Sequence, residues 1–308
     1  MDAGSDASPD GPVVLVADAG TGVLATDATY VYWLDPTNGR ISRCPIAGCP
    51  SGPTVFFQQA GYDQGSGWGI GGIAVTSDTV YFALNQTVSG ELLQCPTSGC
   101  GSPLAFVKTN GGIYGVTADA NHVYYAYDGG LWSMPLGSGG PTLLVTSGVS
   151  AHVGAIAAVN GPVYFATDTP AGPIGECAEN GCQGMPGSLP STGPPLLAVT
   201  LAANSLAAYW TSEASGAILS SLVPSGPASV FASVTAPAQT LVADDHDVYF
   251  GSAQAGGAIY SCPATECGSA QKLVAGNLGN VEALAIDAYR IYAIVFPGQM
   301  RELIEIDR

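Results

Sequence analysis

The feature that most constrains the fold of this chain is a short apolar motif centred on a tyrosine, which returns seven times. Its copies are Val31-Tyr32-Trp33, Val80-Tyr81-Phe82, Val123-Tyr124-Tyr125, Val163-Tyr164-Phe165, Ala208-Tyr209-Trp210, Val248-Tyr249-Phe250 and Ile291-Tyr292-Ala293. Successive tyrosines are 49, 43, 40, 45, 40 and 43 residues apart. Short strands that recur every 40–45 residues or so are typical of a β-propeller, in which each repeat forms one blade. The sequence therefore predicts an all-β, seven-bladed β-propeller of four-stranded antiparallel blades.

The sixth repeat shows how one blade is expected to fold. Turn-forming segments, including a loop over Gly251–Gly257, separate its apolar runs. These runs predict four strands, at Gln239–Ala243, Val248–Phe250, Ala258–Ser261 and Gln271–Val274. The motif places three large residues in a row without alternating polar ones, which indicates a second strand buried on both faces between neighbouring blades.

The last repeat contains only three such strands, at Ala283–Ile286, Arg290–Val295 and Glu302–Ile306. The missing fourth strand is expected at the other end of the chain, in the apolar run over residues 12–17. Pairing of the two chain ends would close the ring and remove two open sheet edges. We therefore expect a single propeller domain over residues 12–308, preceded by a disordered acidic tether over residues 1–11.

The composition limits the classes of partner. The chain has 42 Gly and 22 Pro but only 10% charged residues, which favours strands joined by many turns. Seven Lys and Arg against 24 Asp and Glu give a formal net charge of −17. Nucleic acids and anionic membranes both require clustered cations, so both are disfavoured as partners. No segment approaches the roughly 18 apolar residues of a membrane span. We expect a monomer whose charge serves solubility or, alternatively, attracts cations.

Eight cysteines form four pairs, each with four residues between its members: Cys44 and Cys49, Cys95 and Cys100, Cys177 and Cys182, Cys262 and Cys267. The even number, the constant spacing and the recurrence within the repeat predict four local disulfides. Zinc is the alternative, but each pair would be alone on its blade, without the further ligands that a zinc site needs. Disulfides imply an oxidising compartment, so we expect an exported protein outside the cell, in the periplasm or at the outer cell surface.

An acidic or amide residue recurs just before each tyrosine motif. The set comprises Asp27, Asp78, Asp119, Asn160, Asn204, Asp244 and Asp287. Carboxylates at equivalent positions could in principle bind metal ions. The stronger interpretation is that each side chain caps the tight turn between the first and second strands by accepting backbone N–H groups.

Two repeats carry a family resemblance. Val31-Tyr32-Trp33-Leu34-Asp35 followed by Gly39-Arg40-Ile41, and Ala208-Tyr209-Trp210-Thr211 followed by Gly216-Ala217-Ile218, resemble the YWTD propellers and the related NHL-type propellers. The chain departs from the six-bladed YWTD pattern in its seven repeats and its Cys hairpins, so the resemblance implies a fold and not a partner. The small, acidic N-terminal run resembles the tether of a bacterial surface protein or lipoprotein. The C-P-x-x-G-C hairpins look like those of exported propellers of predatory soil bacteria, a myxobacterial-like style.

Propeller geometry sorts the candidate site residues by face. The loops that enter the innermost strands share a face with the loops between second and third strands, and this face usually hosts ligands. His122 and His246 fall in first-to-second turns on the opposite face. The residues expected at the mouth of the central channel are Tyr114, His152, Gln239 and Glu282. They could hold a cation or act as a general base, or simply line a hydrated channel.

The longest loop is expected over Gln58–Gly72. It is rich in glycine, yet it contains Tyr62, Asp63, Gln64 and Trp68. Aromatic rings beside carboxylate and amide groups suit sugar recognition, since a ring packs against the C–H face while the polar groups bind hydroxyls. Alternatively, Trp68 plugs the channel or packs between blades. The glycines do not form a phosphate loop, because no Lys follows and no helix is expected.

No known catalytic signature appears in the chain. We therefore predict an exported, non-enzymatic propeller that binds a glycan or protein ligand through its loop face and channel mouth, without a cofactor. One alternative is a metal-assisted lyase or hydrolase that uses His152 and Glu282 with a divalent cation. Some seven-bladed propellers, of the streptogramin-inactivating type, are lyases that use His, Glu and a bound metal. With only His152 on the expected ligand face, this chain cannot supply a His pair there. A further alternative is a surface scaffold for protein partners, which a large exposed apolar patch would favour.

Overall fold

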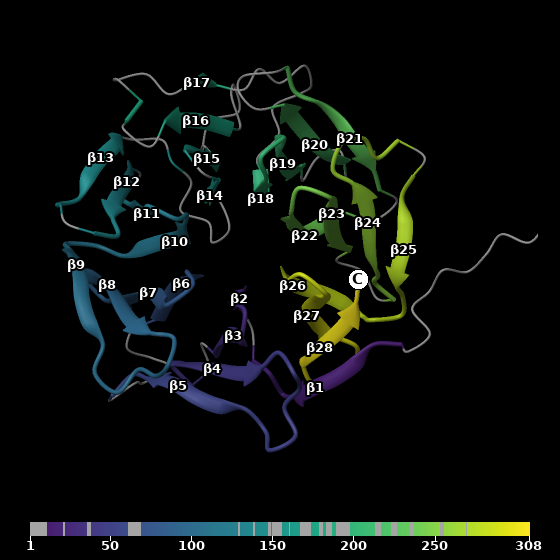
Figure 1. Ribbon diagram of the computed structural model, residues 1–308, viewed down its shortest axis with the longest axis horizontal. Coiled ribbons are helices and arrows are strands. Elements are labelled where there is room, and N and C mark those ends of the chain that lie inside the picture. The colour runs from purple at the N-terminus through teal and green to yellow at the C-terminus, as the bar shows by residue number, and fades with distance from the viewer. Residues whose placement is uncertain are drawn as a thin grey trace, which may run out of the picture.

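The computed structural model describes residues 11–20, 22–35, 38–60, 69–128, 130–137, 139–146, 149, 156–159, 161–166, 174–178, 181–182, 187–188, 198–212, 217–222, 227–234, 237–252, 256–268 and 270–308. They form seven four-stranded antiparallel sheets and no helix. The sheets stand around a central axis, so that the chain is an all-β, seven-bladed β-propeller as predicted (Figure 1). Each innermost strand contacts the innermost strand of the next blade.

We number the blades 1 to 7 in chain order, and each blade runs from its innermost to its outermost strand. Blade 1 consists of β2 (Leu24–Thr26), β3 (Tyr30–Asp35), β4 (Arg40–Pro45) and β5 (Thr54–Gln58). Blade 2 consists of β6 (Gly69–Val75), β7 (Thr79–Gln86), β8 (Ser89–Pro96) and β9 (Leu104–Thr109). Blade 3 consists of β10 (Ile113–Ala118), β11 (His122–Tyr127), β12 (Gly130–Pro135) and β13 (Thr142–Val145).

The second half of the chain repeats this order. Blade 4 consists of β14 (Ile156–Ala158), β15 (Pro162–Ala166), β16 (Ile174–Ala178) and β17 (Gly187–Ser188). Blade 5 consists of β18 (Ala198–Ala203), β19 (Ala207–Ser212), β20 (Ala217–Leu222) and β21 (Ser229–Ser233). Blade 6 consists of β22 (Ala238–Ala243), β23 (Asp247–Ser252), β24 (Ile259–Pro263) and β25 (Lys272–Ala275). Blade 7 consists of β26 (Asn280–Ile286), β27 (Arg290–Phe296), β28 (Glu302–Asp307) and β1 (Val13–Ala17).

The two ends of the chain close the ring in blade 7, which confirms the prediction from the missing fourth strand. β1 pairs antiparallel with β28, so that Val13 lies opposite Glu305 and Ala17 opposite Glu302. Beyond the strand, the Ala19 N–H donates to the Arg301 carbonyl at 3.0 Å. The first and last strands therefore belong to one hydrogen-bonded sheet. The edges of β1 and β28 that face each other are paired and not open.

The repeated motif forms the second strand of every blade and is buried on both faces. Val31, Tyr32 and Trp33 are at most 2% exposed, and the other six copies are buried in the same way. Tyr32 packs in one apolar cluster with Ile73 and Phe82 of the next blade. The core of this molecule is thus a circle of layers between blades, which explains why large residues follow each other without polar alternation.

Five of the seven acidic or amide residues before the motif cap their turns as expected: Asp27, Asp119, Asn204, Asp244 and Asp287. Asp78 instead accepts the hydroxyls of Thr76 and Thr79, and Asn160 lies outside the described residues. The Asp27 Oδ1 atom accepts the N–H groups of Thr29 and Tyr30 at 2.6 and 2.7 Å, and its Oδ2 atom accepts the Tyr32 hydroxyl at 2.8 Å. Asp119 and Asp287 make the same three bonds, and the amide of Asn204 caps its own turn. No cluster of three or more metal-binding side chains occurs among the described residues. The carboxylates serve the turns and the repeat tyrosines.

Four disulfides join the predicted pairs: Cys44 with Cys49, Cys95 with Cys100, Cys177 with Cys182, and Cys262 with Cys267. The cysteines are thus bonded to each other and not arranged around zinc. Three of these hairpins begin with the same bond to the first-to-second turn of their own blade. The N–H groups of Ile46, Thr97 and Ala264 donate to the carbonyls of Thr29, Asp78 and His246 at 2.8–2.9 Å.

Several predicted boundaries were wrong at strand ends. The expected loop over Gln58–Gly72 is shorter, because Gly69–Gly72 belong to β6 and Gly71 and Gly72 are buried against blade 3. A Cβ atom on Gly71 would lie 2.1 Å from the Ile113 carbonyl oxygen, so that the glycines there permit close approach of two strands. In the sixth repeat, Gly251 and Ser252 extend β23 into the expected loop. No helix that could span a membrane occurs among the described residues.

Candidate ligand-binding sites on two faces of the ring

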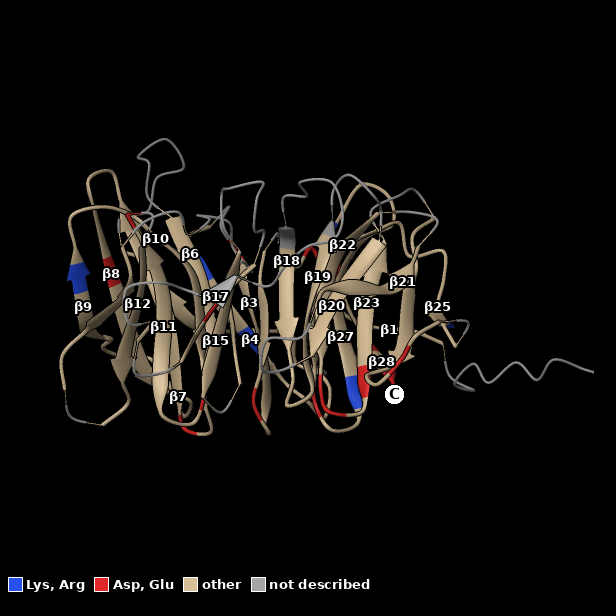
Figure 2. Ribbon diagram, turned by 90° about the horizontal axis from the view of Figure 1, so that it is seen from above, with Lys and Arg blue, Asp and Glu red and all other residues tan. Residues whose placement is uncertain are grey.

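The two faces of the ring differ in their connections and in their charge. We call the face with the first-to-second turns and the Cys hairpins the turn face, and the opposite face the loop face. Figure 2 shows acidic residues gathered along the turn face, at the tips of the short turns. The turns contain Asp27, Asp78, Asp119, Asp244 and Asp287. His246 is exposed in the same turn as Asp244. The loop face carries the entries to the innermost strands.

Three predicted channel-mouth residues lie near the loop-face ends of innermost strands. Tyr114 is on β10 and is 42% exposed, Gln239 is exposed on β22, and Glu282 is on β26. The strand register shifts next to each of them, which marks a β-bulge. Bulges re-aim side chains and are frequent beside sites. Gln239 and Glu282 are on adjacent strands, whereas Tyr114 is on a strand that contacts β6 and β14 instead.

Glu282 is bound to a cation from its own chain. Its Oε2 atom lies 2.6 Å from Arg301 Nε, and both side chains are largely shielded from solvent. The Arg301 guanidinium also lies over the Phe296 ring, 5.0 Å from its centroid. A carboxylate held by a guanidinium in this way is a poor general base and a poor ligand for a second cation. This geometry weakens the predicted catalytic role of Glu282.

A groove at the outer rim of the loop face joins blades 2 and 3. It has a volume of about 270 Å³ and is lined by Val107, Lys108, Thr109, Asn110, Tyr125, Tyr127, Trp132 and Pro141. The Trp132 ring stacks on the buried Tyr125 ring at 6.5 Å between centroids and meets the Tyr127 ring at 6.4 Å. The Lys108 ammonium is 2.7 Å from Glu91. Half-exposed aromatic rings thus stand beside polar groups at the edge of the ring.

Two glycines connect this rim groove to Tyr114. The Asn110 N–H donates to the Tyr127 hydroxyl at 3.2 Å. A Cβ atom on Gly111 would lie 3.3 Å from the Tyr127 ring, and one on Gly112 would lie 2.6 Å from the Tyr114 hydroxyl. The absence of side chains lets both aromatic rings lie directly against the backbone of this loop. Tyr127, the loop and Tyr114 therefore form a continuous surface from the rim towards the channel mouth.

Sequence reasoning missed the rim groove. Tyr127 follows the third repeat motif by two residues, and Trp132 lies opposite Tyr125 on β12, so that the only available signal was an excess of aromatic residues in this repeat. The other predicted site residues, Tyr62, Asp63, Gln64, Trp68 and His152, lie outside the described residues. Their proposed role in ligand binding remains a prediction.

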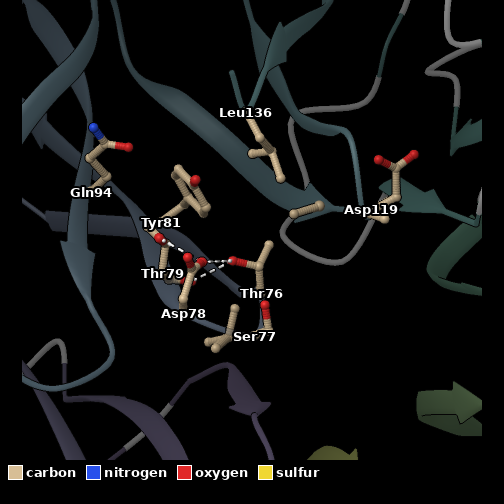
Figure 3. A pocket seen from close by; sticks show the side chains of 11 residues that line it. Thr76, Ser77, Asp78, Thr79, Tyr81, Gln94, Asp119 and Leu136 are labelled. Atoms are coloured by element: carbon tan, nitrogen blue, oxygen red, sulfur yellow. Dashed lines mark hydrogen bonds between the residues drawn. The ribbon is translucent and has the colours of Figure 1, made fainter. Parts of the chain in front are cut away.

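A second pocket opens on the turn face, where blades 2 and 3 meet. It has a volume of about 610 Å³, and Figure 3 shows the side chains that surround it. The first-to-second turn of blade 2 supplies Thr76, Asp78 and Thr79, and blade 3 supplies Asp119 and Leu136. Both threonine hydroxyls donate to Asp78 Oδ1, at 3.4 and 3.0 Å. The lining is completed by Val75, Ser77, Tyr81, Gln94, Ala118 and Ala120.

Comparison with known proteins supports the fold and goes no further. No protein-family model matches the chain, and no curated protein matches its sequence. The structure of U3-55K is similar over 97% of this chain and 98% of that one, with a TM-score of 0.73 and 10% identity. The WD40 beta propeller domain of Doa1 is similar over 96% and 97%, with a TM-score of 0.67 and 10% identity. A chain of the nidogen/laminin complex is similar over 81% and 93%, with a TM-score of 0.57 and 13% identity.

Proposed function

We propose that this chain is an exported, non-enzymatic β-propeller that binds a glycan through its loop face. The observation that carries the proposal is the aromatic surface formed by Trp132, Tyr127 and Tyr114. Sugar rings present C–H faces that pack on aromatic rings, and their hydroxyls bind amides and charged groups. Asn110 and Lys108 supply such groups in the rim groove. Trp68 and Tyr62, predicted from the long loop, stay candidate contacts for the same ligand.

Burial and charge support binding in preference to catalysis. The alternative of a metal-assisted lyase or hydrolase requires Glu282 to act as a base or a metal ligand. The ion pair between Glu282 and Arg301 opposes both roles, because removing a shielded carboxylate from a guanidinium costs free energy. A ligand held by stacking and hydrogen bonds requires no such rearrangement.

The four disulfides support export. They persist in oxidising compartments and are rare in reducing ones, and each closes a hairpin at the turn face. A surface-bound or secreted receptor for polysaccharide is consistent with this chemistry. A bacterial surface lipoprotein, as the N-terminal run suggests, would be one form of it.

A glycan screen on the oxidised protein tests the proposal. The affinity for an oligosaccharide that binds should fall about five- to tenfold in Trp132→Ala, since stacking of a ring on an aromatic side chain contributes on the order of 1 kcal/mol. Asn110→Ala, which leaves the backbone bond to Tyr127 in place, should weaken the same interaction. Tyr289→Ala is the matched control, because Tyr289 is 78% exposed on the opposite face. Equal loss in all three variants, or none in Trp132→Ala and Asn110→Ala, would disprove the assignment.

A further inference from the structure

We call the contact between two neighbouring blades a seam. The turn-face pocket lies at the seam between blades 2 and 3. At three other seams an arginine side chain occupies the corresponding position on the turn face. At the seam between blades 6 and 7, Arg308 extends beyond β28, and its side chain is only 14% exposed. It donates to the Tyr249 hydroxyl at 3.0 Å and to the Asp287 carbonyl at 2.6 Å, and it forms an ion pair with Asp244. The guanidinium thus binds a repeat tyrosine and a turn carboxylate of one blade and a turn carbonyl of the next.

Two further seams are closed by guanidinium groups that arise from different strands. Arg43 of β4 donates to the carbonyls of Thr97 and Ser98 in the Cys95–Cys100 hairpin of blade 2. Arg290 of β27 donates to the Ile46 carbonyl in the Cys44–Cys49 hairpin of blade 1. Burial raises the pKa values of Tyr32 and Tyr292, and the neighbouring Arg43 and Arg290 act against that rise. Each guanidinium therefore lies beside the repeat tyrosine of its own blade.

The pocket between blades 2 and 3 contains the same acceptors without an arginine. Tyr81 is the repeat tyrosine of blade 2. The adjacent turn supplies the Asp78 carboxylate, which comes two residues after Thr76, the residue at the turn position that Asp244 holds at the other seam. Asp119 begins its turn with the same backbone bond as Asp287. Leu136 occupies the hairpin position of Ile46 and Thr97, because its N–H donates to the Asn121 carbonyl at 2.8 Å. Tyr81, Asp78, Asp119 and Leu136 all line the pocket.

One side chain distinguishes this seam from the seam between blades 1 and 2. Arg43 lies opposite Tyr32 in its blade, and Gln94 lies opposite Tyr81 at the same register in blade 2. The shorter and uncharged Gln94 side chain makes no hydrogen bond to blade 3 among the described residues. It lines the pocket instead of bridging it (Figure 3).

We propose that this pocket is a binding site for the guanidinium group of an arginine side chain from a partner protein. A planar guanidinium has five donors in a fixed fork, which suits acceptors that surround it as phenol, carboxylate and carbonyl oxygens. An ammonium group is a compact point charge and matches this arrangement less well. The net charge of −17 and the acidic turn face favour the approach of a basic polypeptide. The site is separate from the loop face and does not depend on glycan binding there.

Binding of small probes tests the proposal directly. We expect N-acetyl-arginine amide to bind at least about tenfold more tightly than N-acetyl-lysine amide, as measured by NMR titration at low salt. A short neutral peptide with one arginine should bind more tightly than the single-residue probe. If the peptide binds no better, a polypeptide partner is excluded. If the arginine and lysine probes bind equally, recognition of the guanidinium is excluded.

Substitutions in the pocket complete the test. Gln94→Arg should abolish arginine binding, because the new side chain can occupy the pocket from within, and it should raise the midpoint of thermal unfolding. Asp78→Asn should weaken binding and leave glycan binding unchanged. Asp245→Asn is the control, because Asp245 is an exposed carboxylate of another turn. Arginine binding that persists undiminished in Gln94→Arg would overturn the proposal. A circular dichroism spectrum of Gln94→Arg that matches that of the parent shows that the variant is folded.

Discussion

The turn-face seams between blades 6 and 7 and between blades 2 and 3 have the same kinds of acceptor but are closed differently. At the first, the nearly buried Arg308 connects Tyr249, Asp244 and the Asp287 backbone. At the second, Tyr81, Asp78 and Asp119 surround an open pocket of about 610 Å³. The comparison teaches that the blades supply the same kinds of acceptor at both seams. Of these two seams only the one with an arginine is closed, and at the three seams that an arginine closes the guanidinium comes from different backbone positions.

The largest effect is expected from the chain segment that completes blade 7, the blade from which Arg308 and Arg290 both extend. Deletion of residues 12–17 removes β1, including the buried Val16 and the partly buried Leu15. Loss of these two side chains alone should cost about 3–6 kcal/mol of unfolding free energy. Denaturant unfolding measures the change, with deletion of residues 2–10 as the control. Unchanged unfolding after removal of β1 would mean that the ring does not require closure by this strand.

Removal of the cation at the closed seam should have the next largest effect. Arg308→Ala leaves Asp244 and Tyr249 without their guanidinium partner, which should destabilise the protein by about 2–3 kcal/mol. Lys108→Ala removes an exposed ion pair and should cost less than about 1 kcal/mol. Gln94→Ala, at the open seam, should change stability by no more than about 0.5 kcal/mol. A loss in Gln94→Ala as large as that in Arg308→Ala would show that the two seams are not different.

The disulfide hairpins contribute to the same closed seams, since Arg290 and Arg43 both donate to their carbonyls. Replacement of Cys44 and Cys49 together by Ser should lower the unfolding free energy by about 2 kcal/mol, because the closed loop is short. Chemical denaturation under oxidising conditions measures this. When the two cysteine replacements are combined with Arg290→Ala, the loss of unfolding free energy should be smaller than the sum of the separate losses, because both changes act on one contact. Losses that are fully additive would show that the disulfide hairpin does not stabilise this seam.

The smallest expected effect is the loss of unfolding free energy at acidic pH. Burial alone would raise the pKa of Asp244, but the N–H groups of Asp247 and His246 and the Arg308 guanidinium outweigh it, so that the pKa is lowered. A carboxyl whose folded pKa is depressed stabilises the fold above its unfolded value of about 3.9, and this stabilisation is lost as the pH falls through the folded pKa. Unfolding measured between about pH 5 and 2 should therefore show a loss that Asp244→Asn reduces. An identical acid profile for the variant would exclude this contribution.

Local patterns in the sequence predicted the features that depend on neighbouring residues. The spacing of the tyrosines predicted seven blades, the spacing of Cys44 and Cys49 predicted a hairpin disulfide, and Asp27 was expected to cap its turn. Each of these features is formed within a few residues or is repeated at a constant interval. Strand ends were less predictable, because Gly71 and Gly72 are read as loop residues until their packing against blade 3 is known.

The candidate sites could be predicted only in part. Tyr114, Gln239 and Glu282 lie near the loop-face ends of innermost strands, because the repeat defines these positions, and their role at the channel mouth stays a prediction. The ion pair of Glu282 with Arg301 was not predicted, since nothing in the sequence indicates which of several carboxylates the arginine meets. The rim groove was missed for a similar reason: it is formed where Tyr127 and Trp132 of one blade meet Lys108 of another.

By itself, the sequence determined the number of blades, the four disulfides, the capped turns and the strand that completes the ring, because periodicity and short-range spacing record burial and local hydrogen bonding. Only the tertiary structure decided which seams are closed and which is open. Arg43, Arg290 and Arg308 reach equivalent places from different strands, and the residues they join are 54, 244 and 64 positions apart. Contacts across such separations depend on the length and direction of side chains after the blades have packed, which no repeat pattern specifies.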